Sequence, residues 1–363
     1  MNKNTVNTQK LFFKKNLLTW NKEENNRTMP WKGEKDPYKI WLSEIILQQT
    51  RVDQGLDYYN RFIKAFPDIK KLAGASENKV FKLWEGLGYY SRCMNLIATA
   101  KKIATDYDGQ FPGQYEDILA LKGVGPYTAA AIASFAFNLP YAVLDGNVFR
   151  VLARYFGYST PTDSSEGKKI FSALANELLD RKQPGLYNQA IMDFGATVCK
   201  PQLPACSSCP LRQDCVALKK DMVNKLPVKD KKTVIKNRWF HYVVAEYKDQ
   251  LLVRKREQKD IWQNLYEFIL IENSKALDLT EINKMVILKE LAVSLKEPGV
   301  ISSPYVQKLT HQTIHARFVR VSLNKKITLK GYEWSAVSQL NQLPFPKIIT
   351  SYLKDKNVSL NLI

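Results

Sequence analysis

Four of the five cysteines in this 363-residue chain fall within 17 residues, at Cys199, Cys206, Cys209 and Cys215. A secreted, disulfide-linked domain would be smaller and richer in cysteine. Zinc and a [4Fe–4S] cluster both accept four cysteines. Zinc folds usually use two C-x-x-C pairs, whereas here only Cys206 and Cys209 form one. The spacing therefore favours one [4Fe–4S] cluster per chain, with four buried cysteines that bind no metal as the weaker alternative.

The charge of the chain indicates the kind of partner. Lys and Arg number 54 against 35 Asp and Glu, which gives a net charge of +19. Such an excess in a folded chain favours a polyanion, most simply nucleic acid. The 45% hydrophobic content excludes a mainly disordered chain. No apolar stretch approaches the roughly 20 residues of a membrane-spanning helix. We therefore expect a cytoplasmic protein without a membrane partner.

Three regions differ in sequence pattern. Residues 8 to about 220 carry apolar side chains at helical spacing and are predicted to be mostly helical. Residues 221–238 are rich in Lys and Arg and poor in apolar groups, which predicts a basic linker. Beyond them, β-branched and aromatic residues predict an α+β domain. Its expected strands are 239–247, 251–253, 265–271 and 317–323, and its expected helices are 281–295 and 348–353.

A glycine motif lies in the middle of the helical region. Gly123 and Gly125 permit a tight turn, and Pro126 suits the first position of a helix over 128–137. Backbone N–H groups at such a helix start bind a phosphate without a side chain. The pattern is that of a helix-hairpin-helix, which grips the DNA backbone without reading sequence. A tight turn between two core helices is the alternative, and the basic charge favours the DNA-binding interpretation.

Two carboxylates are candidates for catalysis. Glu44 lies in a strongly apolar helical run, where burial would raise its pKa and make it a general acid. The alternative is a solvated helix face made of Ser43, Glu44 and Gln48. Asp145 precedes an amphipathic helix and can be simply its N-cap.

Two basic residues follow Asp145 on the same predicted helix. Arg150 and Arg154 are four residues apart and share one face. One interpretation of this arrangement is simply a solvated stripe on the helix surface.

Together these segments resemble the adenine DNA glycosylase (MutY) family of the helix-hairpin-helix DNA glycosylases, over about residues 27–220. The resemblance also includes Pro30-Trp31 and residues 86–92 and 188–190. The hairpin and the cysteine spacing are shared with endonuclease III. That family carries a Schiff-base lysine where this chain has Tyr127, and it lacks a carboxylate at the position of Glu44. Both differences favour the adenine DNA glycosylases.

The resemblance implies a multidomain fold: an all-α helix-hairpin-helix glycosylase core with a [4Fe–4S] cluster loop, and a C-terminal α+β Nudix-like domain. The implied boundaries are a cluster domain from 1–29 and 142–220, a six-helix barrel over 30–141, the linker at 221–238 and a recognition domain over 239–363. A Nudix hydrolase needs several glutamates to hold cations. The comparable helix here offers only Glu290 after Lys289, so we expect this domain to bind and not to hydrolyse.

The implied reaction is hydrolysis of the N-glycosidic bond of adenine mispaired with 8-oxoguanine or guanine in double-stranded DNA, without strong lyase activity. By resemblance, Glu44 is the acid, Asp145 stabilises the cationic sugar, and Tyr127 and Asn147 orient water and sugar. The implied binding residues are Arg27, Trp31 and Gln189 around adenine, Gln49 and Tyr89 in the space left by the flipped base, Gly123 and Gly125 at the backbone, and Thr310 and His311 at the oxidised base. The four cysteines hold the cluster, and the enzyme is expected to be a monomer.

Two positions depart from the family pattern. Lys32 stands where some relatives have arginine, and Leu309 stands where the family's recognition loop has an aromatic residue. Two rival functions remain open from the sequence. One is an endonuclease III-like glycosylase and lyase acting on oxidised pyrimidines. The other is a non-catalytic iron–sulfur protein that binds DNA or transfers electrons.

Overall fold

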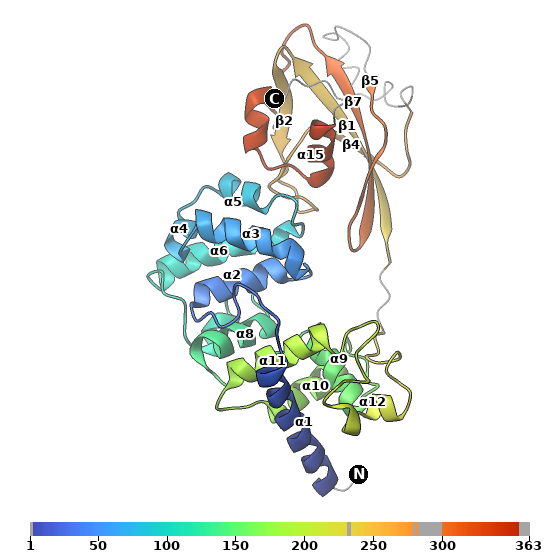
Figure 1. Cartoon of the computed structure of the whole chain (residues 1–363). Coiled ribbons are helices and arrows are strands. Elements are labelled where there is room, and N and C mark those ends of the chain that lie inside the picture. Colours follow the sequence, from blue (N-terminus) through green and yellow to red (C-terminus); the bar gives the residue numbers. More distant parts are fainter. Residues whose placement is uncertain (1–2, 231–233, 279–280, 282–299, 356–363) are drawn as a thin grey trace. The chain divides into compact units, whose positions relative to one another are not determined.

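The structure is a computed structural model that describes residues 3–230, 234–278, 281 and 300–355, with side chains from residue 7 onward. It divides into two compact units (Figure 1). The first contains residues 1–73 and 98–231, and the second contains residues 74–97 and 232–363. In the part of the chain that is described, no helix combines the length and apolar character needed to cross a membrane.

The first unit is helical. Local sequence defines where its helices begin: Asp36 accepts a hydrogen bond from Tyr38 N (2.9 Å) and Pro37 is the first helical residue of α2. Gly157, at φ 74°, ends α9. The helices are α1 (Lys3–Glu23), α2 (Pro37–Leu47), α3 (Val52–Ala65), α4 (Ile69–Ala73), α7 (Tyr115–Leu119), α8 (Pro126–Phe137), α9 (Gly146–Phe156), α10 (Ser165–Leu178), α11 (Pro184–Thr197), η1 (Arg212–Asp214) and α12 (Val216–Lys219), while α6 (Tyr90–Asp106) belongs to both units.

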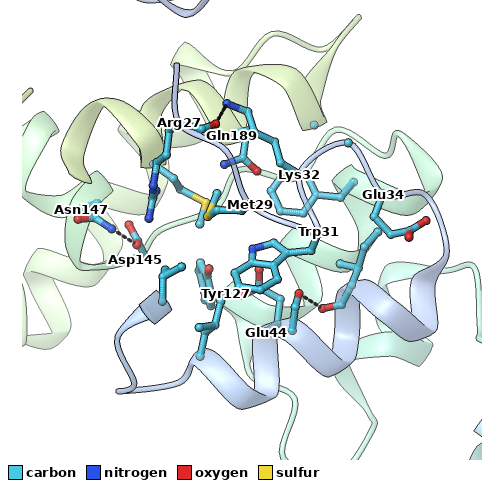
Figure 2. A pocket seen from close by; sticks show the side chains of 18 of the residues that line it. Arg27, Met29, Trp31, Lys32, Glu34, Glu44, Tyr127, Asp145, Asn147 and Gln189 are labelled. Carbon is cyan, nitrogen blue, oxygen red and sulfur yellow. Dashed lines mark hydrogen bonds between the residues drawn. The ribbon is translucent and has the colours of Figure 1, made fainter. Parts of the chain in front are cut away.

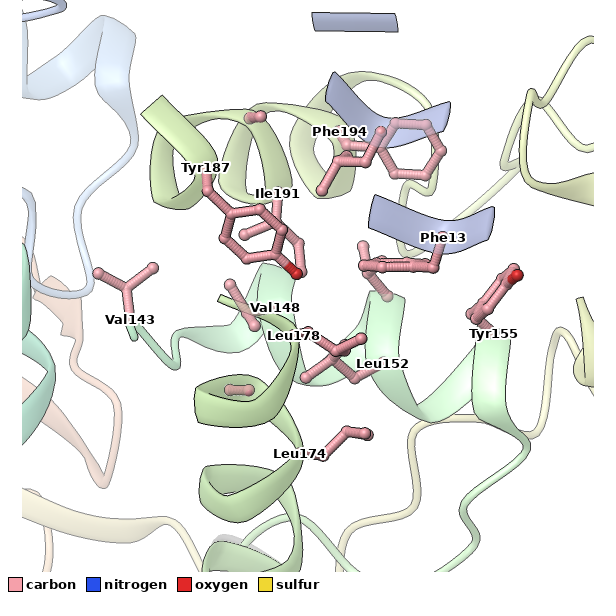
Figure 3. Packing of buried hydrophobic residues seen from close by; sticks show 14 of the residues in the cluster. Phe13, Val143, Val148, Leu152, Tyr155, Leu174, Leu178, Tyr187, Ile191 and Phe194 are labelled. Carbon is pink, nitrogen blue, oxygen red and sulfur yellow. The ribbon is translucent and has the colours of Figure 1, made fainter. Parts of the chain in front are cut away.

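One apolar core joins α1 to the helices that follow residue 142 (Figure 3). Phe13 packs on Tyr155 of α9, with ring centroids 4.8 Å apart. Trp20 makes an edge-on contact with Phe194 of α11 at 5.0 Å. Aromatic pairs of this kind add stabilisation beyond their buried area. The N-terminal helix and residues 143–226 therefore share one core, although they are far apart in the sequence.

Part of the segment predicted as a linker packs on the first unit. Leu226 is buried in the core around α9. The carbonyl of Val228 accepts a hydrogen bond from Thr162 N (3.0 Å). The first strand of the second unit already begins at Lys236.

The second unit is built on an eight-stranded mixed sheet with the order β3-β2-β1-β7-β5. Its central pair, β1 and β7, is parallel, in register from Lys236 opposite Gln312 to Glu246 opposite Ser322. β4 also pairs with β1, β6 pairs with β7, and β8 pairs with β2. The elements are β1 (Lys236–Tyr247), β2 (Gln250–Lys255), β3 (Tyr266–Glu267), β4 (Ile269–Asn273), β5 (Val300–Ile301), β6 (Tyr305–Lys308), β7 (Gln312–Ser322), β8 (Glu333–Ala336), η2 (Val337–Gln342) and α15 (Lys347–Lys354).

Each face of this sheet has its own packing. Val243, Val319 and other aliphatic residues form one cluster. Aromatic rings pack on the opposite side, where Tyr352 of α15 stacks on Phe318 at 3.9 Å. Because successive strand residues point to opposite faces, the alternation of aliphatic and aromatic residues in β1 and β7 determines both layers.

The strand predicted over 265–271 is two strands in the structure. Residues 266–267 pair with β2, whereas 269–273 pair with β1. The chain thus passes from one neighbour to the other at residue 268. The helix predicted over 281–295, with Lys289 and Glu290, lies outside the described residues.

Residues 74–97 belong to the second unit through contacts of α5 (Glu77–Trp84) and the turn after it. Lys82 Nζ donates to the carbonyl of Leu343 (3.1 Å), and Phe345 N donates to Glu85 Oε1 (3.0 Å).

Candidate active site

A cavity of about 730 Å³ in the first unit collects the catalytic residues implied by the resemblance. This volume is typical of small-molecule and cofactor sites. Its wall comes mainly from residues 27–35, α2, α8, the N-terminal end of α9, and α11 (Figure 2). Arg27, Trp31, Glu44, Gln49, Tyr127, Asp145, Asn147 and Gln189 all line it.

Glu44 is the buried carboxylate of this cavity, with a relative exposure of 7%. Burial raises its pKa to about 7, with a smaller contribution from the charge of Asp145, while the hydrogen bond with Tyr127 acts in the opposite direction. Ser43 is also buried, so the solvated face considered from the sequence does not form. Glu44 can therefore hold a proton near neutral pH, as a general acid must.

Asp145 is the N-cap of α9 and also lines the cavity. Its Oδ1 caps α9 by accepting from Val148 N (2.7 Å), and its Oδ2 accepts from Asn147 Nδ2 (2.7 Å). Burial nevertheless raises the pKa of Asp145, and these bonds and the charge of Arg150 offset that rise only in part. The N–H groups thus favour the anionic form of Asp145, but desolvation outweighs them.

Arg150 and Arg154 are buried, so the solvated stripe considered from the sequence is wrong. Arg150 Nη2 donates to Asn147 Oδ1 (2.7 Å) and its Nε donates to the carbonyl of Cys199 (2.7 Å). Arg154 Nη1 donates to the carbonyl of Lys200 (2.7 Å). Both side chains turn inward because the cysteine segment packs on this face of α9 and supplies carbonyl acceptors. Arg150 thereby connects that segment to Asn147 in the cavity wall.

Asp193 on α11 is a further residue of the site that sequence reasoning did not identify. It is fully buried, and its Oδ1 accepts from Arg27 Nη1 (2.8 Å) and Gln189 Nε2 (2.9 Å). Its Oδ2 accepts from Asn25 Nδ2 (2.9 Å) and lies 3.0 Å from Lys32 Nζ. A carboxylate in the apolar segment Ile191 to Phe194 was the available signal, since such a group is costly unless it is paired.

Gln49 and Tyr89 share an unusual backbone conformation. Both are non-glycine residues in the left-handed region, at φ 57° and 47°. Such backbone is uncommon for these residue types and tends to occur at functional sites. Both side chains are exposed. In the second unit, the hydroxyls of Tyr89 and Thr310 form a hydrogen bond.

The glycine motif forms the turn predicted for it. Gly123 has φ 79°, and Gly125 is the N-cap of α8 with Pro126 in its first turn. The turn is closed by a hydrogen bond from Val124 N to the carbonyl of Leu121 (3.1 Å). Gly123 is exposed, so the start of α8 is accessible to a phosphate.

The four cysteines line one small pocket together with Arg154 and Arg212. Burial raises the pKa of Cys206, Cys209 and Cys215, to about 12 for Cys209, and neighbouring thiols add to the rise. Because the thiolate is the form that binds a metal, these raised pKa values do not by themselves favour metal binding. Among the described residues, no three His, Cys, Asp or Glu side chains are grouped so that they could hold a metal ion.

Thr310 and His311 form the tip of the hairpin between β6 and β7, and both are exposed. Leu309 N donates to the carbonyl of Gln312 (2.8 Å) and closes this tip. The carbonyl of His311 accepts from Lys236 N at the start of β1 (3.0 Å). The backbone of the loop is therefore held, and both side chains are exposed, with the Thr310 hydroxyl bonded to that of Tyr89.

Residues 42–176 match the sequence profile of the HhH-GPD superfamily base excision DNA repair proteins, and residues 241–355 match that of a NUDIX domain. The helical core also resembles solved structures. A thermostable thymine-DNA glycosylase shares 30% identity with a TM-score of 0.55 and covers 59% of this chain and 99% of its own. A non-covalent endonuclease III–DNA complex, at 19% identity and a TM-score of 0.50, covers 61% and 99% and shows the same fold. The chain thus has a helix-hairpin-helix glycosylase core and a Nudix-like domain.

Curated relatives extend the match through both parts. The adenine DNA glycosylase of Buchnera aphidicola subsp. Schizaphis graminum is 32% identical over 94% of this chain and 98% of its own length. The adenine DNA glycosylase of Mus musculus is 42% identical over 56% of this chain and 41% of its own length. This chain belongs to the adenine DNA glycosylase family, and it is accordingly an enzyme that hydrolyses N-glycosyl bonds.

Proposed function

We propose that the protein binds double-stranded DNA as a monomer and removes adenine mispaired with 8-oxoguanine or guanine. The observation that carries this proposal is the pairing of Glu44, buried with a pKa near 7 and bonded to Tyr127, with Asp145 in the same cavity. Glycoside cleavage through an oxocarbenium-like transition state uses two carboxylates in different protonation states. The names of the family members support adenine as the base.

In the proposed reaction the adenine leaves the base stack and enters the cavity. Glu44 protonates N7, so that the base departs neutral. Asp145 stabilises the positive charge that develops on the sugar. Tyr127 and Asn147 hold water and sugar in position through their bonds to Glu44 and Asp145.

We propose that the enzyme releases the base without strong lyase activity, because the lysines of the cavity wall are bonded to other groups of the protein. Lys32 Nζ lies 3.0 Å from Asp193 and donates to the carbonyl of Arg27 (2.8 Å). Lys35 Nζ donates to the carbonyl of Phe135 (2.9 Å). Tyr127 offers a hydroxyl where a lyase of the endonuclease III type has its lysine.

Single-turnover adenine release from duplexes containing A:8-oxoguanine, A:G and A:C tests this function. We expect adenine release from the A:8-oxoguanine and A:G duplexes. We also expect no borohydride-trapped complex on damaged duplexes. Trapping on oxidised pyrimidines without adenine release would instead indicate an endonuclease III-like lyase. Binding without release of any base would indicate a non-catalytic protein.

DNA contact is assigned to the start of α8 and to the recognition loop. The amides around Gly123 and Gly125 suit a backbone phosphate. Gln49 and Tyr89 are proposed to fill the space left by the flipped adenine. Thr310 and His311 are proposed to contact the oxidised base, with Leu309 lacking the family's aromatic contact.

One [4Fe–4S] cluster is proposed to be held by Cys199, Cys206, Cys209 and Cys215. When bound, it would cross-link the segment that Arg150 and Arg154 attach to α9. We expect four irons per purified chain, measured anaerobically by metal analysis, with a brown colour. A Cys93→Ser variant is the control, because Cys93 is buried away from this pocket and should keep its iron. Stoichiometric zinc without iron would contradict this assignment.

A further inference from the structure

Asp193 controls which atom Gln189 presents to the base cavity. The two ends of a glutamine amide have nearly the same shape, so its neighbours determine the orientation. The carboxylate of Asp193 can only accept, and it lies 2.9 Å from Gln189 Nε2. The NH₂ group must therefore face Asp193. The carbonyl oxygen Oε1 is then left for the cavity, where it accepts no hydrogen bond from the residues that the structure describes.

That orientation has a chemical consequence for a bound purine. Gln189 lines the cavity, and its amide lies beside Arg27 and Lys32 in Figure 2. A carbonyl oxygen accepts from the 6-amino group of adenine and finds no donor on a purine that lacks this group. A site built to bond a substrate N–H discriminates strongly against analogues without it.

The same carboxylate anchors two cations of the cavity wall. Arg27 Nη1 lies 2.8 Å from Asp193 Oδ1, and Lys32 Nζ lies 3.0 Å from Oδ2. Lys32 also donates to the carbonyl of Arg27, and this bond links the two ends of the segment between them. Other side chains thus contact both oxygens of Asp193. Of these residues, only Gln189 is close to Asp193 in the sequence.

We propose that Asp193 is a positioning residue for base recognition. It fixes the Gln189 amide so that Oε1 accepts from the 6-amino group of the flipped base, and it holds Arg27 and Lys32 in place around that base. This inference rests on the proposed release of adenine.

The experiment measures one ratio in the full-length holoenzyme. It is the single-turnover rate of adenine release divided by that of unsubstituted purine, each opposite 8-oxoguanine in the same duplex. In Asp193→Asn the neighbour can donate as well as accept, so the Gln189 amide is free to turn. We expect the ratio to fall by about ten-fold, the effect of one lost hydrogen bond in a specificity site.

Two further variants separate positioning from stability. Combining Asp193→Asn with Gln189→Glu exchanges amide and carboxylate, so an acceptor again faces the cavity and the ratio should return toward the parent value. Asn188→Ala is the matched control. Asn188 is buried on the same helix and bonds Val143 N (3.2 Å) and the carbonyl of Tyr141 (2.9 Å), away from the amide of Gln189. It should lower stability without changing the ratio.

An unchanged ratio in folded Asp193→Asn overturns the inference, as does a ratio that falls equally in Asn188→Ala. If Asp193→Asn does not fold, Gln189→Leu decides, because it removes the acceptor and must lower the ratio; an unchanged ratio there overturns the inference. A parent enzyme that releases no adenine refutes the proposed function instead. The two failures are therefore distinguishable.

Discussion

At the scale of single residues, the site depends on polar groups whose burial local sequence does not reveal. The run around Glu44 has enough polar positions for a solvated face, and only packing of α2 against α8 turns Ser43 and Glu44 inward. Asp193 is a similar case, since its partners Arg27 and Lys32 lie more than 160 residues away. The sequence could point to Glu44 and Asp145, which the structure brings into one cavity, whereas the partners of these groups could not be predicted.

The first prediction concerns Glu44→Gln, which keeps the size of the side chain and removes its proton. Loss of general acid catalysis lowers rates by about 10²–10⁴-fold. We expect adenine release under single-turnover conditions to fall by at least this much while affinity for the mismatch is mostly retained. A rate within a few-fold of the parent would show that Glu44 is not the acid.

The same residue predicts a pH dependence of stability. Its folded pKa of about 7 lies above the unfolded value near 4.5, so the stabilising effect is complete below pH 4.5 and is lost as pH rises through 7. Relative to Glu44→Gln, the parent should lose about 3 kcal/mol of unfolding free energy between pH 4.5 and 8. Urea unfolding of both proteins at the two pH values measures this. A difference that does not vary with pH would contradict the raised pKa.

At the scale of helices, α11 lies close to the N-terminal end of α9, which carries Asn147. A Cβ on Gly195 would lie 2.6 Å from Asn147 Cβ and 3.0 Å from the carbonyl oxygen of Asn147. These distances are too short for either helix to remain in place. The absence of a side chain at Gly195 therefore permits α11 to lie this close to Asn147.

Gly195→Ala should accordingly destabilise the protein by about 1–3 kcal/mol, as overpacking does, and should slow base release. Urea unfolding and single-turnover kinetics measure the two effects. Gly113→Ala is the matched control, because its added Cβ would make an ordinary contact of 3.7 Å with Phe137. Equal behaviour of the two variants would show that this helix contact does not position the site.

At the scale of the whole molecule, the chain combines two units of different structural class. Apolar residues at helical spacing and the strand pattern predicted a helical part and an α+β part, and the matches at 42–176 and 241–355 confirm this combination. The sequence could not show that residues 74–97 group with the sheet or that Leu226 packs with the helices. Both depend on contacts between segments far apart in the chain, which no local pattern records.

The proposed division of tasks predicts how specificity responds to the recognition loop. Combining Thr310→Ala with His311→Ala should preserve adenine release opposite guanine and reduce the preference for 8-oxoguanine. Each such contact is worth about 1–3 kcal/mol of discrimination. Single-turnover rates on A:8-oxoguanine and A:G duplexes give the preference. A preference equal to that of the parent would place recognition of the oxidised base in the helical unit.

The core that joins α1 to later helices also has a consequence for synthesis on the ribosome. The aromatic partners of Phe13 and Trp20, Tyr155 and Phe194, are 142 and 174 residues further along the chain. At about 5–20 residues per second, α1 emerges and remains without these partners for on the order of ten seconds. Its apolar face is exposed to nascent-chain chaperones during that time. The unit that holds the catalytic cavity is therefore completed late, after its first helix has long left the ribosome.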